Sequence, residues 1–84
     1  MTELTSLRNI GKGLEQKLRS VDITTAEEFM EIGSEEAFVR LREQYSNISL
    51  VHLYALEGAV SGVDFNKLSA QTKKRLKDLN DSFK

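Results

Sequence analysis

The sequence predicts an all-α fold, a compact single domain of five or six helices over residues 1–84. Apolar residues recur mostly at spacings of three and four, which is the helical period. Proline is absent, and β-branched residues do not gather in the alternating runs typical of strands. Residues that begin and end helices are abundant. No cysteine is present to form a disulfide or a thiolate metal site, so the core must come from packed helices.

The first two helices are expected to be joined by a short turn. Leu4 and Leu7 predict a short opening helix that ends at Asn9-Ile10-Gly11. A second helix follows from about residue 13 to residue 20 and buries Leu18. A tight connection then leads to the third helix.

Capping residues locate the next two helices. Thr25, followed three residues later by Glu28, forms a capping-box pattern and predicts a helix over residues 26–32. The glycine after this helix is expected to close its last turn. Ser34 then caps a helix that reaches about Tyr45.

Three more elements complete the chain. A helix is expected over about residues 49–61, a short helical turn over residues 64–68, and a last helix after its cap, Ser69. The apolar positions expected in the core are Ile10, Leu14, Leu18, Phe29, Ile32, Ala37, Phe38, Leu41, Leu53, Leu56, Val60, Leu76 and Leu79.

The turn between the first two helices is the strongest candidate for a binding site. Ile10 is expected to fill the space between the helices, Asn9 to tolerate the left-handed region, and Gly11 to allow a positive φ or a close backbone approach. The backbone amides from Gly11 to Leu14 then lie unpaired at a helix N-terminus, where they and the helix dipole attract phosphate. The alternative is a tight helix–helix turn without a ligand. The residues predicted to contact nucleic acid here are Arg8, Asn9, Gly11, Lys12, Gly13 and Lys17.

The charged residues are unevenly distributed along the chain. The formal net charge is −1, with glutamates dominating residues 25–44 and lysines dominating residues 64–84. A local basic face still attracts phosphate, because charges beyond about 10 Å are largely screened at about 0.1 M salt. Lys73 and Lys74 therefore have two interpretations: a second phosphate-contacting strip that cooperates with the turn, or an ordinary solvated helix face.

A stripe of small residues in the helix over residues 49–61 permits another helix to approach closely, either within the domain or from a second copy. Its members are Ala55, Gly58, Ala59 and Gly62. Glu57 lies between these small residues and has two interpretations: a buried carboxylate paired with a base, or an exposed side chain, which is the one we expect.

The residues do not predict catalysis or a metal site. His52 is the only histidine, and no second histidine or cysteine completes a metal site around it. The glutamates between Glu27 and Glu36 lack the alternating oxygen ligands of a calcium loop and favour a solvated face. No nucleophile and base are suggested, and Gly11-Lys12-Gly13 lacks the spacing of a P-loop. We therefore expect a non-enzymatic protein without a metal or cofactor.

The segment Asn9-Ile10-Gly11 resembles the turn of the helix-hairpin-helix motif of DNA repair and replication proteins. That turn usually reads glycine, apolar residue, glycine, and here Asn9 stands at the first glycine. Asp22-Ile23 stands where the family often has Gly-Ile after the second helix. The resemblance implies a helix-hairpin-helix-like N-terminal half that contacts the DNA backbone.

A longer resemblance runs from about Thr5 to Leu79 and is similar to the C-terminal domain of TfoX/Sxy competence regulators. Its most specific segments are Asn9-Ile10-Gly11-Lys12 and Ala55-Leu56-Glu57-Gly58-Ala59. The resemblance implies a compact five-helix domain and a link to the regulation of natural transformation genes in bacteria. Many members of that family carry an additional N-terminal α/β domain, so we expect a stand-alone form here.

Two hypotheses for function follow from these observations. The first is a DNA-associated binding module that contacts backbone phosphates without reading base sequence. The second is a protein–protein interaction module that docks a transcription or competence factor or self-associates, as the acidic stretch from Glu27 to Glu36 suggests. Nothing in the sequence resembles a signal peptide, and no apolar run approaches the roughly 18 residues that a membrane span needs. We therefore expect a cytoplasmic monomer or weak homodimer that does not enter a membrane.

Overall fold

The computed structural model describes residues 2–82, and this range contains five α-helices and two short 3-10 helices. The all-helical class predicted from the sequence is therefore confirmed. In chain order the elements are η1 (Leu4–Ser6), α1 (Lys12–Ser20), α2 (Ala26–Ile32), α3 (Ser34–Gln44), α4 (Leu50–Ser61), η2 (Phe65–Lys67) and α5 (Ala70–Asp81).

Local capping explains several of these boundaries. The Thr25 hydroxyl accepts a hydrogen bond from the Glu28 amide at 3.1 Å, as the capping-box pattern predicts. The Ser69 hydroxyl accepts one from the Thr72 amide at 3.1 Å and begins α5. Gly62 ends α4 in the left-handed region, with φ of 76°, where a glycine has no steric penalty.

The junction between α2 and α3 differs from the prediction. Gly33, with φ of 89°, ends α2 and also begins α3, so Ser34 is the first residue of α3 and not its cap. The Ser34 side chain is buried and donates a hydrogen bond to Glu57 at 2.6 Å. The hydroxyl is therefore used for contact between helices α3 and α4.

The opening helix and the turn after it also differ from the prediction. Only the three-residue 3-10 helix η1 forms before the turn. Asn9 has the positive φ, 71°, whereas Gly11 has φ of −93° and ψ of −177°, an extended conformation that any residue adopts. We call residues Leu7–Lys12, which join η1 to α1, the hairpin turn.

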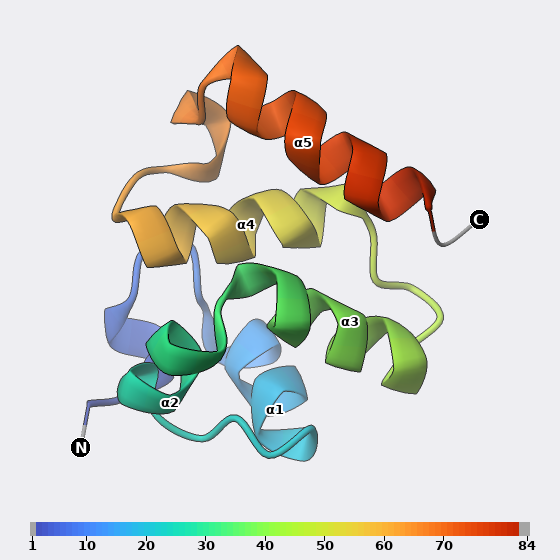
Figure 1. Ribbon diagram of the computed structural model, residues 1–84. Helices are drawn as coiled ribbons and strands as arrows, with labels where there is room; N and C mark the ends of the chain where they lie inside the picture. The colour runs from blue at the N-terminus through green and yellow to red at the C-terminus, as the bar shows by residue number, and fades with distance from the viewer. Residues whose placement is uncertain (1, 83–84) are drawn as a thin grey trace.

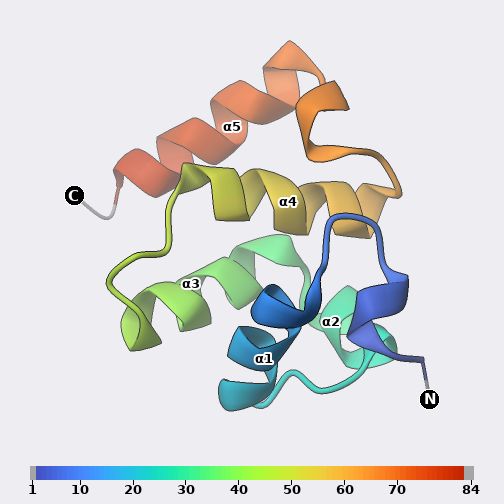
Figure 2. The same cartoon turned by 180° about the vertical axis from the view of Figure 1, so that it is seen from behind.

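Helix α4 lies at the centre of the fold. Helices α1, α2 and α3 lie on one side of it, and α5 with η2 lies on the other (Figures 1 and 2). Because α4 is covered from both sides, it is apolar around most of its circumference, unlike an amphipathic surface helix. The buried core consists of Leu4, Ile10, Leu18, Ile23, Phe29, Ala37, Phe38, Leu41, Ile48, Leu53, Leu56, Ala59, Leu68 and Leu76.

The predicted core agrees closely with this set. Ile10 is 5% exposed and fills the space beneath the hairpin turn, as expected. The predicted core residues that are only half-buried, although packed against the core, are Leu14, Ile32, Val60 and Leu79. Within residues 2–82, no helix has both the length and the apolar character needed to cross a membrane.

Candidate nucleic-acid interface

The N-terminus of α1 presents a group of backbone amides to solvent. Gly11 is the N-cap, and the first helical hydrogen bond runs from the Glu15 amide to the Gly11 carbonyl at 2.9 Å. Within residues 2–82, the amides from Gly11 to Leu14 have neither a side-chain cap nor a carbonyl partner. Gly11, Lys12 and Gly13 are exposed, and no other part of the protein lies within 4 Å of a Cβ built on either glycine. These amides are therefore accessible to an anion.

The Asn9 side chain points into the protein and not toward this group of amides. Its Nδ2 donates to the carbonyls of Val63 at 3.0 Å and Ala55 at 3.4 Å, and its Oδ1 accepts from the Phe65 amide at 3.3 Å. The side chain thus attaches the hairpin turn to α4, to Val63 and to the first residue of η2. Asn9 shapes the predicted site through its backbone conformation, while its amide group is occupied within the fold.

Gly58 makes room for this contact. A Cβ at Gly58 would lie 2.4 Å from Asn9 Nδ2 and 2.5 Å from the Val63 carbonyl oxygen, which is closer than real Cβ contacts allow. Gly58 and Ala59 are both buried. The small-residue stripe therefore serves packing within the domain at these positions, the first of the two uses predicted for it.

Arg8 lies beside the same contact but is paired with an acid. Its Nη1 is 2.9 Å from Asp64 Oδ1, and about half of each side chain is exposed. The two residues are separated by 56 positions in the sequence, so sequence reasoning did not predict the pair. Asp64 reduces the positive charge available next to the hairpin turn.

The two lysines of α1 have different surroundings. Lys12 is exposed at the N-terminus and has no hydrogen-bond or ion-pair partner within residues 2–82. Lys17 is half-buried further along the helix, where its Nζ lies 5.3 Å from the centre of the Tyr45 ring. Five residues of α-helix span about 7.5 Å along the axis. Lys12 is therefore the predicted lysine that lies directly at the open amides.

Lys73 and Lys74 are not part of this surface. Both belong to α5, and α4 lies between α5 and α1 (Figures 1 and 2). Lys74 is exposed and Lys73 is half-buried. A strip formed jointly by these lysines and the hairpin turn, one of the two interpretations considered above, does not match the arrangement of the helices.

Glu57 is mostly buried and lies next to a base, so the expectation that it is exposed is wrong and the alternative interpretation, a buried and paired carboxylate, is the one observed. Its side chain is 16% exposed and accepts hydrogen bonds from Ser34 at 2.6 Å and Ser61 at 3.2 Å. Arg75 Nη2 lies 3.6 Å from the carboxylate, and Arg75 also pairs with Glu35. This network connects α3, α4 and α5, and an acid with so many partners acts in packing.

His52 has a local structural role at the start of α4. Its Nδ1 accepts a hydrogen bond from the Ser49 amide at 3.1 Å and completes a capping box. Burial lowers the pKa of His52 below its ordinary value, and the nearby Lys17 charge adds to this effect. Within the described residues, no group of three or more histidine, aspartate or glutamate side chains could hold a metal ion.

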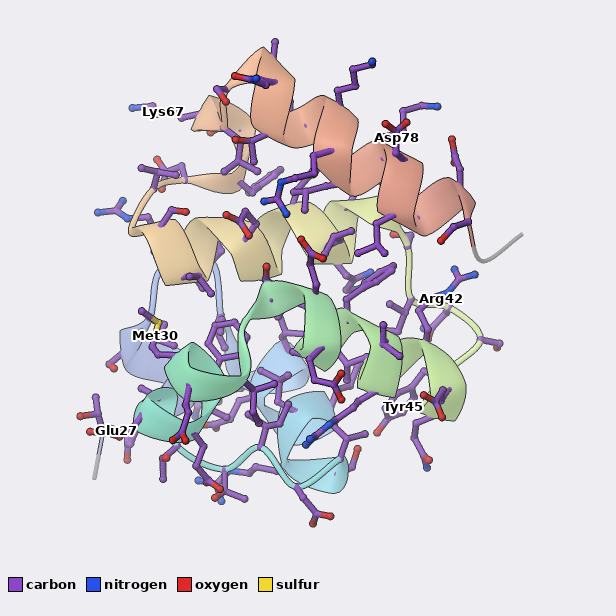
Figure 3. The ribbon with its side chains drawn as sticks, in the orientation of Figure 1. Glu27, Met30, Arg42, Tyr45, Lys67 and Asp78 are labelled. Atoms are coloured by element: carbon purple, nitrogen blue, oxygen red, sulfur yellow. The ribbon has the colours of Figure 1, made fainter. Side chains whose placement is uncertain are left out.

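Several glutamates of the acidic stretch are engaged in local contacts. Glu27 accepts hydrogen bonds from the Thr2 amide at 2.9 Å and the Thr2 hydroxyl at 2.7 Å, and these lower its pKa to about 2. The Thr24 hydroxyl and amide likewise lower the pKa of Glu28. Glu27 projects at the edge of the molecule (Figure 3). This stretch stabilises the N-terminal half as well as presenting negative charge.

These features define a small all-helical domain in which a tight turn is held against a central helix and a helix N-terminus is left open. The chain belongs to the TfoX C-terminal domain family, whose sequence model matches residues 1–79. This family is regulatory in type and is not a known enzyme family, and membership suggests a competence-related role.

Two solved structures share this fold closely. They are crystal structures of proteins from Listeria monocytogenes, one triclinic form described as an uncharacterized protein and one tetragonal form described as a protein of unknown function. Each is 43% identical to this chain, superimposes with a TM-score of 0.94 and covers 98% of it. The matched region is 93% of the triclinic-form chain and 100% of the tetragonal-form chain. A search of curated proteins found no match.

Proposed function

We propose that this domain binds the phosphate backbone of DNA, without reading base sequence, through the N-terminus of α1. The observation that carries the proposal is the set of amides from Gly11 to Leu14, which have no acceptor within residues 2–82 and of which the first three belong to exposed residues. Four such donors and the positive end of the helix dipole favour a phosphate oxygen. Lys12 adds a charge at the same place.

The charges near the hairpin turn set the expected strength of binding. Arg8 forms an ion pair with Asp64, and Lys12 is the unpaired lysine at the open amides. Contact with about two phosphates gives a logarithmic salt slope of about −2. Binding should therefore be weak, salt-dependent and indifferent to base sequence.

A titration of a fluorescein-labelled DNA duplex at low salt tests the proposal. Wild-type protein is expected to bind with a dissociation constant no weaker than about 100 μM, the upper end for non-specific DNA binding. Lys12→Glu should weaken binding about tenfold or more, because it places a negative charge at the open amides. Lys74→Glu on α5 is the matched control with the same change of charge and should have little effect.

Two results would contradict the proposal. One is the absence of binding by wild-type protein at about 100 μM. The other is an equal loss of affinity in the Lys12→Glu and Lys74→Glu variants, because a general loss of positive charge would then explain the result.

A second candidate function is a protein–protein interaction through α2. The observation that favours it is Met30, which is 46% exposed and lies on the outer side of α2 near Glu27 (Figure 3). An exposed apolar side chain among glutamates fits a basic, partly apolar partner surface. Light scattering tests for self-association. Co-purification tests for a partner, by comparing the proteins captured by wild type with those captured by the Met30→Glu variant. A monomer that captures the same proteins with and without Met30→Glu would exclude this role for α2.

A further inference from the structure

The segment Val63–Lys67 lies directly against the hairpin turn. The Phe65 amide donates to Asn9 Oδ1 at 3.3 Å, and Asp64 pairs with Arg8 at 2.9 Å. In Figure 2 the blue turn and the orange segment meet at the same end of α4. Residues 8–9 and 64–65 therefore form one continuous surface, although 56 positions separate them in the sequence.

An exposed aromatic ring belongs to this surface. Phe65 is 43% exposed, and within residues 2–82 only Met30 and Val51 are other large apolar side chains so accessible. Its backbone is fixed by Asn9, so the ring is attached to an anchored part of the chain. Lys67, two residues later, is exposed and points away from the protein (Figure 3). Exposed aromatic rings beside cations are typical of surfaces that bind unpaired nucleic-acid strands.

We infer that this surface binds single-stranded DNA in preference to duplex, with a base stacked on the Phe65 ring. The inference rests on the proposed function and names the form of DNA. Asn9, which contacts the Phe65 amide, and Lys12 are separated by at most about 11 Å of extended chain. A single strand can therefore place a base on the ring and a phosphate at the open amides.

The balance of contacts favours the single strand. Arg8 is shared with Asp64 and Lys17 lies over Tyr45, so few cations at the hairpin turn are available to phosphates. A duplex offers mainly phosphates to such a surface, because its bases are stacked on each other. An unpaired base adds a stacking contact that duplex DNA lacks, and such a contact changes affinity by about tenfold or more. With so few phosphate contacts, the stacking contact decides the preference.

A tryptophan placed at this position reports stacking directly, since the natural chain contains no tryptophan. The Phe65→Trp variant is titrated with a mixed-sequence single strand of about 12 nucleotides and with the matching duplex. Fluorescence of the new indole should be quenched by the single strand and far less by the duplex. The matched control is Val51→Trp at the other end of α4, where the residue is 58% exposed and quenching is not expected.

A second variant measures the contribution of the ring. Phe65→Leu keeps an apolar side chain and should weaken single-strand binding about tenfold, while leaving duplex binding within about twofold of wild type. Circular dichroism melting identifies any loss of folding. If Phe65→Leu is unfolded, the quenching measured with Phe65→Trp tests by itself whether a base stacks at this position.

The outcomes separate this inference from the proposed function. Suppose that the single strand quenches the fluorescence of Phe65→Trp but not of Val51→Trp, and that adding Lys12→Glu abolishes the quenching. This result supports both the single-strand inference and the proposed function. Binding of both DNA forms with equal affinity and no quenching overturns the single-strand inference and leaves phosphate binding at α1 intact. If neither form binds, the proposed function fails, and the inference that rests on it fails with it.

Discussion

Replacing Gly58 with alanine should destabilise the domain, although the same change normally stabilises a helix. Alanine is favoured over glycine inside a helix by about 1 kcal/mol. At Gly58, however, the added Cβ would lie 2.4 Å from Asn9 Nδ2 and 2.5 Å from the Val63 carbonyl oxygen. Both neighbours must move, and the carbonyl belongs to the backbone. The hydrogen bonds that join Asn9 to Val63 and to Phe65, the first residue of η2, would weaken as these groups move apart.

The size of the effect follows from these terms. Forcing extra volume into a packed contact costs about 1–3 kcal/mol. Weakening two hydrogen bonds adds about 1 kcal/mol for each. After subtracting the gain in helix propensity, we expect Gly58→Ala to lower the free energy of unfolding by about 2–4 kcal/mol. For a domain of this size, that loss corresponds to a decrease in Tm of about 8–30 °C.

Urea and thermal unfolding followed by circular dichroism measure this effect. Gly13→Ala is the control, because nothing lies within 4 Å of a Cβ there and the residue is in the first turn of α1. Gly13→Ala should leave stability unchanged or raise it by up to about 1 kcal/mol. If Gly58→Ala is as stable as Gly13→Ala, the conclusion that the hairpin turn packs too closely on α4 to admit a Cβ at Gly58 is refuted.

Three further predictions concern pH, a buried hydrogen bond and helix capping. Lowering the pH from about 7 to about 5 should reduce the unfolding free energy, measured in urea, more in wild type than in His52→Gln. The pKa of His52 in the folded protein lies below its ordinary 6.5, so the unfolded chain takes up the proton first and stability decreases as the pH is lowered. An equal dependence of the unfolding free energy on pH in wild type and His52→Gln would contradict this. Glu57→Ala should cost about 1–3 kcal/mol in the same assay, because the buried Ser34 hydroxyl loses its acceptor, and an unchanged midpoint would show that another acceptor replaces it. Thr25→Ala should cost about 1 kcal/mol and lower Tm, whereas an unchanged Tm would mean that the capping bond contributes nothing.

Much of the fold could be predicted because helix ends depend on residues that are close in sequence. Thr25 and Glu28 lie three positions apart, and so do Ser69 and Thr72, and both pairs form as predicted. The opening helix, of which only η1 forms, and the junction at Gly33 were exceptions. A glycine with a positive φ can end one helix and begin the next, so Ser34 became available for a contact across the domain.

The candidate site was predictable in part for the same reason. The open amides at α1 follow from a helix that begins after a glycine, which has no side chain to accept their hydrogen bonds. The left-handed conformation was expected at Asn9 or Gly11, and the structure assigns it to Asn9. Both glycine and asparagine can adopt this conformation, but only asparagine has a side chain that can form the long-range hydrogen bonds seen here.

The sequence by itself therefore determined the helical class, most helix boundaries and most of the core, because spacing and capping act within about four residues along the chain. Only the tertiary structure decided the partners of Arg8, Asn9 and Glu57. Asp64 is 56 positions from Arg8, and Val63 is 54 positions from Asn9. Such contacts arise when the hairpin turn, α4 and α5 pack together, and no local pattern in the sequence specifies which polar groups then meet.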